Sequence, residues 1–223
     1  MQKFQTPTPV STLLDIPAGR IQFIAADRAD TVVEVRPADA SKSRDLKAVE
    51  EIEVAYADGV LRIEAAPAKN RLLGNSGSVE VTVQLPAGSR IEGKSGAAEL
   101  RGVGRLGEVV FEGGYRQVKL DEAAEVRLSV HDGDVAVGRL AGPAEISTQR
   151  GDIRIAEAAG GEVSLSTQKG DIEVAAAAGV SAVLDAGTGH GRISNSLKNS
   201  AGTDAALSIH ATTSYGDITA RSL

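Results

Sequence analysis

Four aspartates, each directly after a glycine, recur in the second half of this sequence and offer its clearest chemistry: Asp134, Asp152, Asp171 and Asp217. If the repeats that carry them stack in parallel, neighbouring carboxylates lie about 4.8 Å apart and repel one another. A bound cation, ion pairs with Arg150 and Lys169, or capping of the turn backbone by each carboxylate would relieve this repulsion. One aspartate per repeat cannot supply the roughly six to eight oxygens that calcium takes. The sequence therefore favours capping.

The aspartate column breaks at Gly191-Arg192, where an arginine beside His190 replaces the carboxylate. The break indicates either a local functional feature or another way of neutralising the stack. The three histidines, His131, His190 and His210, lie at different distances from their turn glycines. Because they form no column of ligands, they do not predict a zinc site.

A second column precedes the turns and consists of Thr148, Thr167, Thr188 and Thr213. No base recurs beside these hydroxyls, so they predict a hydrogen-bond ladder rather than a nucleophile. The chain has no cysteine, and the common catalytic and nucleotide-binding motifs are missing. We therefore expect no enzyme activity, no catalytic residue, no metal and no cofactor. The residues predicted to form an interaction surface are Asp134, Arg150, Asp152, Lys169, Asp171, His190, Arg192 and Asp217.

Composition narrows the class of protein further. Of the 223 residues, 42% are hydrophobic but only 3% are aromatic, so the core must consist of Val, Ile, Leu and Ala. The net charge of −6 disfavours nucleic acid as a partner. The N-terminal stretch contains no apolar run of the length that a signal peptide needs, and no later stretch approaches a membrane span. The sequence thus predicts a cytoplasmic protein.

The elements that position these residues are repeats. Turn glycines or their equivalents fall at Gly96, Arg116, Gly133, Gly151, Gly170, Gly191 and Gly216. A spacing near 18 to 20 residues, with two short alternating runs per copy, is typical of one coil of a β-solenoid. We expect about seven coils over residues 89–223, stacked in sequence order. The inward positions are Val126, Leu128, Val130, Val135, Val137, Ala144, Ile146, Thr148, Ile153, Ile155, Val163, Leu165, Thr167, Ile172, Val174, Leu207, Ile209, Ala211, Thr213, Ile218 and Ala220.

Residues 1–88 predict a β-rich cap that is contiguous with the solenoid. Alternating runs indicate strands at 13–16, 21–24, 31–35, 51–56, 60–64 and 78–85. Pro17-Ala18-Gly19 predicts a turn between the first two, and Asp58-Gly59 predicts a hairpin. One short helix is expected within 41–51 and a loop over 65–78.

The recurring T-x-x-G-D-[IV] unit, as in Thr148–Ile153, Thr167–Ile172 and Thr213–Ile218, resembles the DUF4097 family of β-strand-repeat, adhesin-like proteins. The segments 16–21, 79–88 and 191–197 fit the same family. The likeness covers roughly residues 13–223 and is greatest to the soluble members common in actinobacteria. It implies a right-handed β-solenoid and brings no catalytic residues with it.

These observations favour a non-enzymatic interaction or scaffold protein that binds a protein partner, or itself, through its sheet faces or its C-terminal edge. That edge is expected at the last coil, which ends at Leu223, and the polar segment 194–204 or another subunit would cover it. Two alternatives stay open. One is a carbohydrate-active β-helix enzyme, and the other is a binder of a cation or small molecule along the Gly-Asp column.

Overall fold

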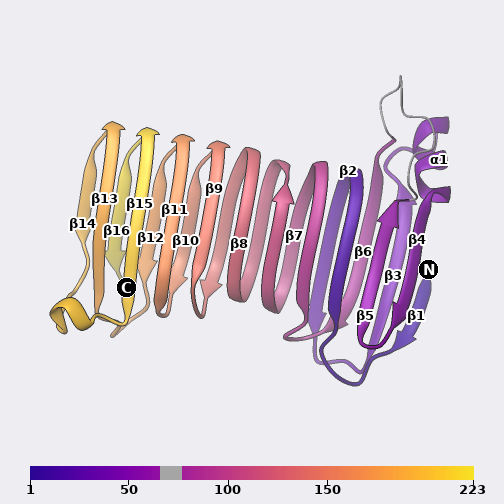
Figure 1. Cartoon of the computed structure of the whole chain (residues 1–223), viewed down its shortest axis with the longest axis horizontal. Helices are drawn as coiled ribbons and strands as arrows, with labels where there is room; N and C mark the ends of the chain where they lie inside the picture. The colour runs from indigo at the N-terminus through magenta and orange to yellow at the C-terminus, as the bar shows by residue number, and fades with distance from the viewer. Residues whose placement is uncertain (66–76) are drawn as a thin grey trace.

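The strands of the chain lie side by side in one long stack (Figure 1). The computed structural model describes residues 1–65 and 77–223, and the strands among these residues belong to a single 16-stranded sheet. The N-terminal part contains β1 (Gln2–Gln5), β2 (Ser11–Ala26), β3 (Asp30–Pro37), α1 (Ser43–Glu50), β4 (Ile52–Ala57), β5 (Val60–Ala65) and β6 (Val79–Pro86). The remainder contains β7 (Arg90–Gly113), β8 (Tyr115–Leu140), β9 (Ala144–Arg150), β10 (Ile153–Ala158), β11 (Gly161–Lys169), β12 (Ile172–Ala176), β13 (Ala182–His190), β14 (Ile193–Ser196), a short 3-10 helix (Gly202–Asp204), β15 (Leu207–Tyr215) and β16 (Ile218–Ser222).

The repeats stack as two parallel ladders, one on each face of the molecule. On one face β8 pairs with β9, β9 with β11, and β11 with β15. On the other face β8 pairs with β10, β10 with β12, and β12 with β16. Equivalent residues stay in register, as Val126, Ala144 and Val163 do. This parallel pairing of successive repeats confirms an all-β, solenoid-like fold, because a hairpin meander would pair its strands antiparallel.

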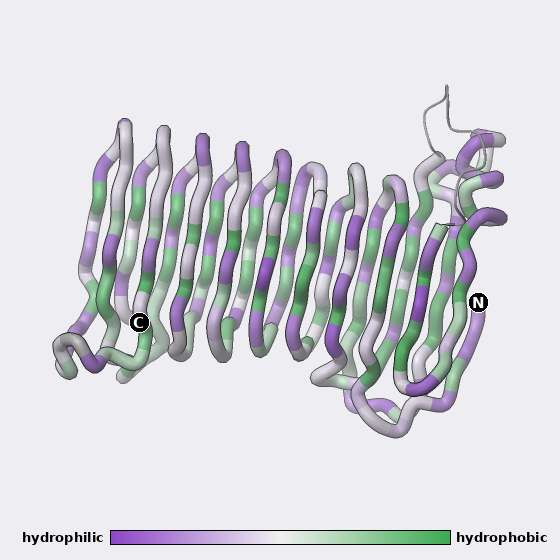
Figure 2. The backbone as a smooth tube through the Cα atoms, viewed as in Figure 1, coloured by the Kyte–Doolittle hydropathy of each residue, from purple (hydrophilic) through white to green (hydrophobic). Residues whose placement is uncertain are grey.

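The core lies between the two faces and is filled from both. Every inward position predicted from the repeat is buried, from Val126 in β8 to Ala220 in β16. Figure 2 shows the corresponding alternation of hydrophobic and hydrophilic residues along each strand. Small and branched side chains dominate, with Phe23 and Phe111 as the largest fully buried ones. The period-2 pattern was therefore sufficient to identify the core.

The order of the coils differs from the order in the sequence. The last coil, β15 and β16, lies between the coil of β11 and β12 and the coil of β13 and β14. The prediction that the C-terminal coil forms the edge is therefore wrong, and the outermost coil is Ala182–Ser196. In Figure 1 the C-terminus accordingly lies one coil inside the end of the stack.

Inward side chains explain this order. Asn195 lies opposite Ala220 and so takes an inward position, while the last coil offers Leu207, Ile209 and Ile218 at such positions. Stacking in sequence order would bury the amide of Asn195 between two apolar positions, those of Val174 and Ala220, whereas the last coil buries only apolar groups and Thr213. The coil with the polar substitution therefore lies outside.

The N-terminal end of the stack is closed by antiparallel strands. β2 is internal, with β7 on one side and β5 and β6 on the other, and all three pairs are parallel. β4 then pairs antiparallel with β5, β3 with β6, and β1 with β3. The rings of Phe4 and Tyr56 meet at 5.5 Å between centroids. We call β1, β3, β4 and α1 the capped end.

Most of the elements expected in the N-terminal part are confirmed. The two runs at 13–16 and 21–24 form one continuous strand, β2, because the chain bends at Pro17–Gly19 without leaving the sheet. Asp58 and Gly59, with φ of +51° and +79°, form the hairpin turn between β4 and β5. The helix lies at Ser43–Glu50. The loop expected at 65–78 falls mostly on residues 66–76, which lie outside the described residues.

Helix α1 is fastened to the sheet by one buried acidic side chain. The carboxylate of Asp45 is almost fully buried and accepts a hydrogen bond of 3.0 Å from the backbone N–H of Ser78. This bond joins the helix to the start of β6. Among residues 1–65 and 77–223, no helix has both the length and the apolar character to cross a membrane.

Candidate interaction surfaces

The predicted glycine column forms a row of turns along one edge of the stack. We call this row, at Gly133, Gly151, Gly170, Gly216 and Gly191, the turn edge. Gly133, Gly151 and Gly170 have φ of +147°, +135° and +154°, which side-chain-bearing residues rarely adopt. A Cβ on Gly170 would also collide with the carbonyl oxygen of Gly151. Glycine is needed here because neighbouring turns pack backbone against backbone.

The four aspartates cap the neighbouring turn, which confirms the favoured interpretation of their column. Oδ1 of Asp134 accepts the N–H of Asp152 at 2.9 Å, and Oδ1 of Asp152 accepts the N–H of Asp171 at 2.8 Å. Oδ1 of Asp171 accepts the N–H of Asp217 at 2.7 Å, and Oδ1 of Asp217 accepts the N–H of Arg192 at 2.8 Å. Each carboxylate thus joins two coils, and the donated N–H offsets repulsion within the column.

The threonine column is a second ladder between coils. The hydroxyl of Thr167 donates to the carbonyl oxygen of Gly151 at 3.1 Å, and that of Thr213 donates to Gly170 at 3.0 Å. Thr188 donates to Gly216 in the same way at 2.9 Å. The carbonyls of Gly151, Gly170 and Gly216 are thereby satisfied by the neighbouring coil. The prediction of a structural ladder is confirmed.

Arg192 marks the end of the aspartate column. Its coil is the outermost one, so a carboxylate at this position would have no further turn to cap among the described residues. The guanidinium instead donates to Oδ2 of Asp217 at 3.1 Å. The backbone and side-chain hydrogen bonds from Arg192 lower the pKa of Asp217. Of the two alternatives for the break in the column, the structure supports neutralisation of the stack.

Arg150 does not pair with Asp152, so the alternative of ion pairs within the column is not what relieves its repulsion. Its guanidinium lies 2.8 Å from Oδ2 of Asp132, which faces it across the β8–β9 pair. The carboxylate of Asp152 points instead at the backbone of the next turn. Lys169 forms no ion pair with any residue in the described part of the chain. The lysine and arginine therefore do not neutralise the aspartate column.

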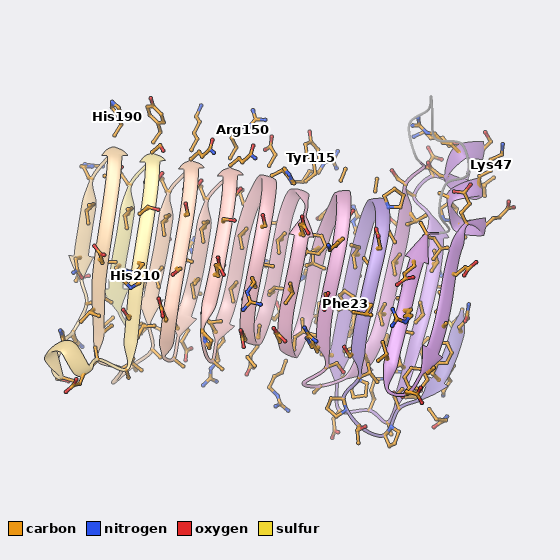
Figure 3. The ribbon with its side chains drawn as sticks, in the orientation of Figure 1. Phe23, Lys47, Tyr115, Arg150, His190 and His210 are labelled. Atoms are coloured by element: carbon orange, nitrogen blue, oxygen red, sulfur yellow. The ribbon has the colours of Figure 1, made fainter. Side chains whose placement is uncertain are left out.

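His190 lies at the same edge, in the residue before its turn glycine. Its ring stacks on that of Tyr215, with centroids 4.8 Å apart and planes 9° apart. Figure 3 shows His190, Arg150 and Tyr115 projecting from this one edge. The sequence thus brought the predicted surface residues to one place, but it missed the aromatic pair because the coils of His190 and Tyr215 adjoin only in the actual coil order.

The turn edge does not have the ligand set of a metal site. Within residues 1–65 and 77–223, no three histidine or acidic side chains are grouped as metal ligands. One oxygen of each column aspartate already accepts a backbone N–H. A cation would have to compete with these hydrogen bonds.

The sequence analysis did not identify a cluster of three side chains whose residue types match those of a catalytic triad. The hydroxyl of Ser208 lies 3.4 Å from Nε2 of His210, and Nδ1 of His210 lies 3.4 Å from Oδ2 of Asp185 (Figure 3 labels His210). Acyl transfer also needs N–H donors aimed at the developing oxyanion. Here β15 is paired on both sides, with β11 and β13, so its backbone donors serve the sheet. The three side chains form an exposed cross-strand ladder and not a catalytic triad.

A second cluster lies on the other face of the stack from β15, in a hollow that we call the polar hollow. It holds two carboxylates, Glu80 and Glu99, beside Arg20 and Tyr115. Arg20 lies 3.1 Å from Glu80 and 3.5 Å from Glu99. Glycoside hydrolysis requires two carboxyl groups in different protonation states. In this hollow both carboxylates instead lie within ion-pair distance of the same guanidinium, which accounts for them as an ion-pair cluster.

The strands β13 and β14 leave one end of the stack uncovered, and we call them the open end. Leu184 and Ala186 point toward the core but are only partly buried, and Ile193 is 46% exposed. Leu197, the first residue after β14, is likewise only partly buried against the core. The carbonyl oxygen of Lys198 then accepts the N–H of Ala182, and its N–H donates to the hydroxyl of Ser222, so the segment runs along the ends of the strands.

The fold and these surfaces define a solenoid-like β-strand-repeat protein without an assembled catalytic site among its described residues. The chain belongs to the Toastrack DUF4097 family, whose model matches residues 11–222. No curated protein matches the sequence.

Two of the solved structures that match this chain show the likeness in fold. A “putative adhesin” from Bacteroides fragilis NCTC 9343 is 17% identical, with a TM-score of 0.52 over 100% of this chain and 95% of that chain. A “putative adhesin” from Parabacteroides distasonis ATCC 8503 is 18% identical, with a TM-score of 0.50 over 98% and 95%. At these identities the likeness concerns the fold alone.

Proposed function

We propose that this protein is a non-enzymatic interaction module that binds a protein partner through the ends and faces of its stack. The observation that carries the proposal is the open end, where apolar core side chains and two strand edges stay uncovered. Uncovered strand edges are templates for pairing with another chain. The names of the two structural neighbours agree with a binding role.

The turn edge is the second part of the proposed surface. Its aspartates serve the stack, whereas Arg150 and His190 project into solvent above it (Figure 3) and Lys169 is exposed. These side chains would add charge and aromatic contacts to a partner that extends over this edge.

The finer features of the shape are also proposals. We infer that the solenoid is right-handed, as the family resemblance implies, and that residues 89–223 make about seven coils beyond a capping segment of residues 1–88. The parallel pairing of β2 with β7 supports continuity between the two parts. The cytoplasmic location stays a prediction.

The alternatives are weaker on physical grounds. A carbohydrate-active enzyme needs an acid and a base, and the carboxylates of the polar hollow share Arg20. A cation binder needs free oxygens at the aspartate column, where one oxygen per residue is engaged.

Calorimetry with calcium on the wild type, Asp152→Asn and Asp171→Asn should show no binding heat. The variants should keep or gain stability, because asparagine retains the acceptor oxygen and removes a like charge.

The proposal is tested by capture of partners from native cells with the wild type, Ile193→Lys and Leu46→Lys. Ile193 and Leu46 have similar exposure, 46% and 45%, but lie at opposite ends of the molecule. A specific partner should be lost with Ile193→Lys and kept with Leu46→Lys, and purified components should reproduce the difference. Binding that ignores both substitutions would contradict a site at the open end.

A further inference from the structure

We propose that the partner at the open end is a second copy of this chain, joined antiparallel, end to end, about a two-fold axis. This inference rests on the proposed function and names the partner. Its starting point is the shape of the open end, which presents β13 on one face, β14 on the other, and the core between them.

The first argument is the cross-section of the stack. One extended peptide could pair with the edge of β13 or with that of β14, but it would leave the other edge and the apolar layer between them in water. The open end of another copy has the same two layers at the same separation. It therefore covers both edges and the side chains of Leu184, Ala186 and Ile193 at once, and it sets the polar strand that carries Asn195 against its own copy and not against an apolar coil.

The second argument is that β13 lacks the features that prevent strand addition. Its nine residues, Ala182–His190, contain no proline or lysine, and its register with β15 has no bulge. Natural edge strands are usually protected by such features. Gly187 faces away from the core, and a Cβ there would meet nothing within 4 Å, so this face of β13 has room for a substitution that tests pairing.

Charge and register agree with a two-fold axis. Side chains alternate along a strand, so two copies of β13 can place their core residues on the same face only in certain registers. The two-fold axis must then pass midway between one residue and its own copy. Pairing centred on Ala186 places Asp185 of one copy beside Gly187 of the other, so no like charges are opposed.

The third argument is that the other end differs. The capped end has short antiparallel strands, β1 and β4, and its Lys3 pairs with Asp30 at 2.9 Å. Since the two ends do not match, head-to-tail growth is disfavoured, and association through the open end stops at two copies.

Sedimentation of the full chain over about 1 to 100 μM tests this inference. The wild type and Leu46→Lys should form dimers, whereas Ile193→Lys should weaken dimerisation by at least about tenfold, because it places a charge in the joined core. Gly187→Asp provides a second disruption without a core change, because it opposes two carboxylates across the two-fold axis, and Gly187→Asn is its uncharged matched control. Circular dichroism establishes that each variant is folded.

A wild type that stays monomeric over this range would overturn the inference, as would a dimer lost with Leu46→Lys but kept with Ile193→Lys and Gly187→Asp. A monomer that nevertheless captures a different protein through Ile193 would refute self-association and leave the proposed function standing. Loss of both binding modes would refute both.

Discussion

The two ends of this molecule differ in how the apolar core of the stack is covered. At the capped end the chain leaves the repeat, turns three strands antiparallel and brings Phe4 against Tyr56 across the core. At the open end the repeat simply stops, with Ile193 half exposed in the last layer. A stacked repeat buries its core only where another layer follows, so an end needs either different residues or another molecule. The capped end has different residues, and we propose that the open end is covered by another molecule.

Matched isoleucines measure the difference between the ends most directly. Ile63 in β5 has no exposed surface, whereas Ile193 in β14 is 46% exposed. Ile63→Ala should lower the free energy of unfolding by about 2 to 5 kcal/mol, and Ile193→Ala by less than about 1 kcal/mol. Denaturant unfolding at concentrations where the chain is monomeric measures both. Equal losses would mean that the two ends are packed alike.

Matched glycines test whether the outer coil can move. A Cβ on Gly19 would collide with the carbonyl oxygen of Val79, and one on Gly191 with that of Gly216. β6, which carries Val79, is held by β3, whereas the coil of Gly191 has no further coil outside it. Gly19→Ala should therefore cost roughly 2 to 4 kcal/mol and Gly191→Ala about half as much. Thermal unfolding measures both losses. Gly59→Ala is the control, because Gly59 also has positive φ but an added Cβ there meets nothing within 4 Å. A larger loss for Gly191→Ala than for Gly19→Ala would contradict this expectation.

Hydrogen exchange compares the ends without a substitution. Amides of β2 lie between two paired neighbours, whereas β13 is paired on one side only. In the monomer, the β13 amides bonded to β15 should exchange about 10 to 100 times faster than those of β2. In the dimer this difference should shrink. Uniform protection in the monomer would contradict an open end.

An acid titration gives the smallest contrast. Hydrogen bonds from Arg28 and Lys3 hold the pKa of Asp30 at about 2 in the capped end, while Arg192 lowers the pKa of Asp217 at the open end. A depressed folded-state pKa stabilises the protein above the ordinary aspartate value near 4, and the gain is lost as the pH falls toward 2. Asp30→Asn should flatten the stability profile in that window more than Asp217→Asn does, because Asp30 has two cationic partners. Identical profiles for the two variants and the wild type would refute these roles.

Much of the interior could be read from the repeated segments. Ile153 and Ile172, which end successive copies of the T-x-x-G-D-[IV] unit, form a cross-strand pair in the structure. The alternation of apolar residues also identified inward positions that are all buried. The capping role of the aspartates also followed, because glycine at a turn leaves a backbone N–H that a short carboxylate can reach. These features depend on one repeat and its immediate neighbour, and a sequence describes such local relations well.

The ends could not be read in this way. The sequence places Thr213–Ile218 last, but the stack places it inside, because the coil with Asn195 is the poorer one to set between two apolar coils. The contacts of His190 with Tyr215 and of His210 with Asp185 follow from that exchange. A repeat pattern specifies what each coil buries and how its turn closes. The choice between two similar neighbours depends on the packing energy of the whole stack, and this protein's exposed surface results from that choice.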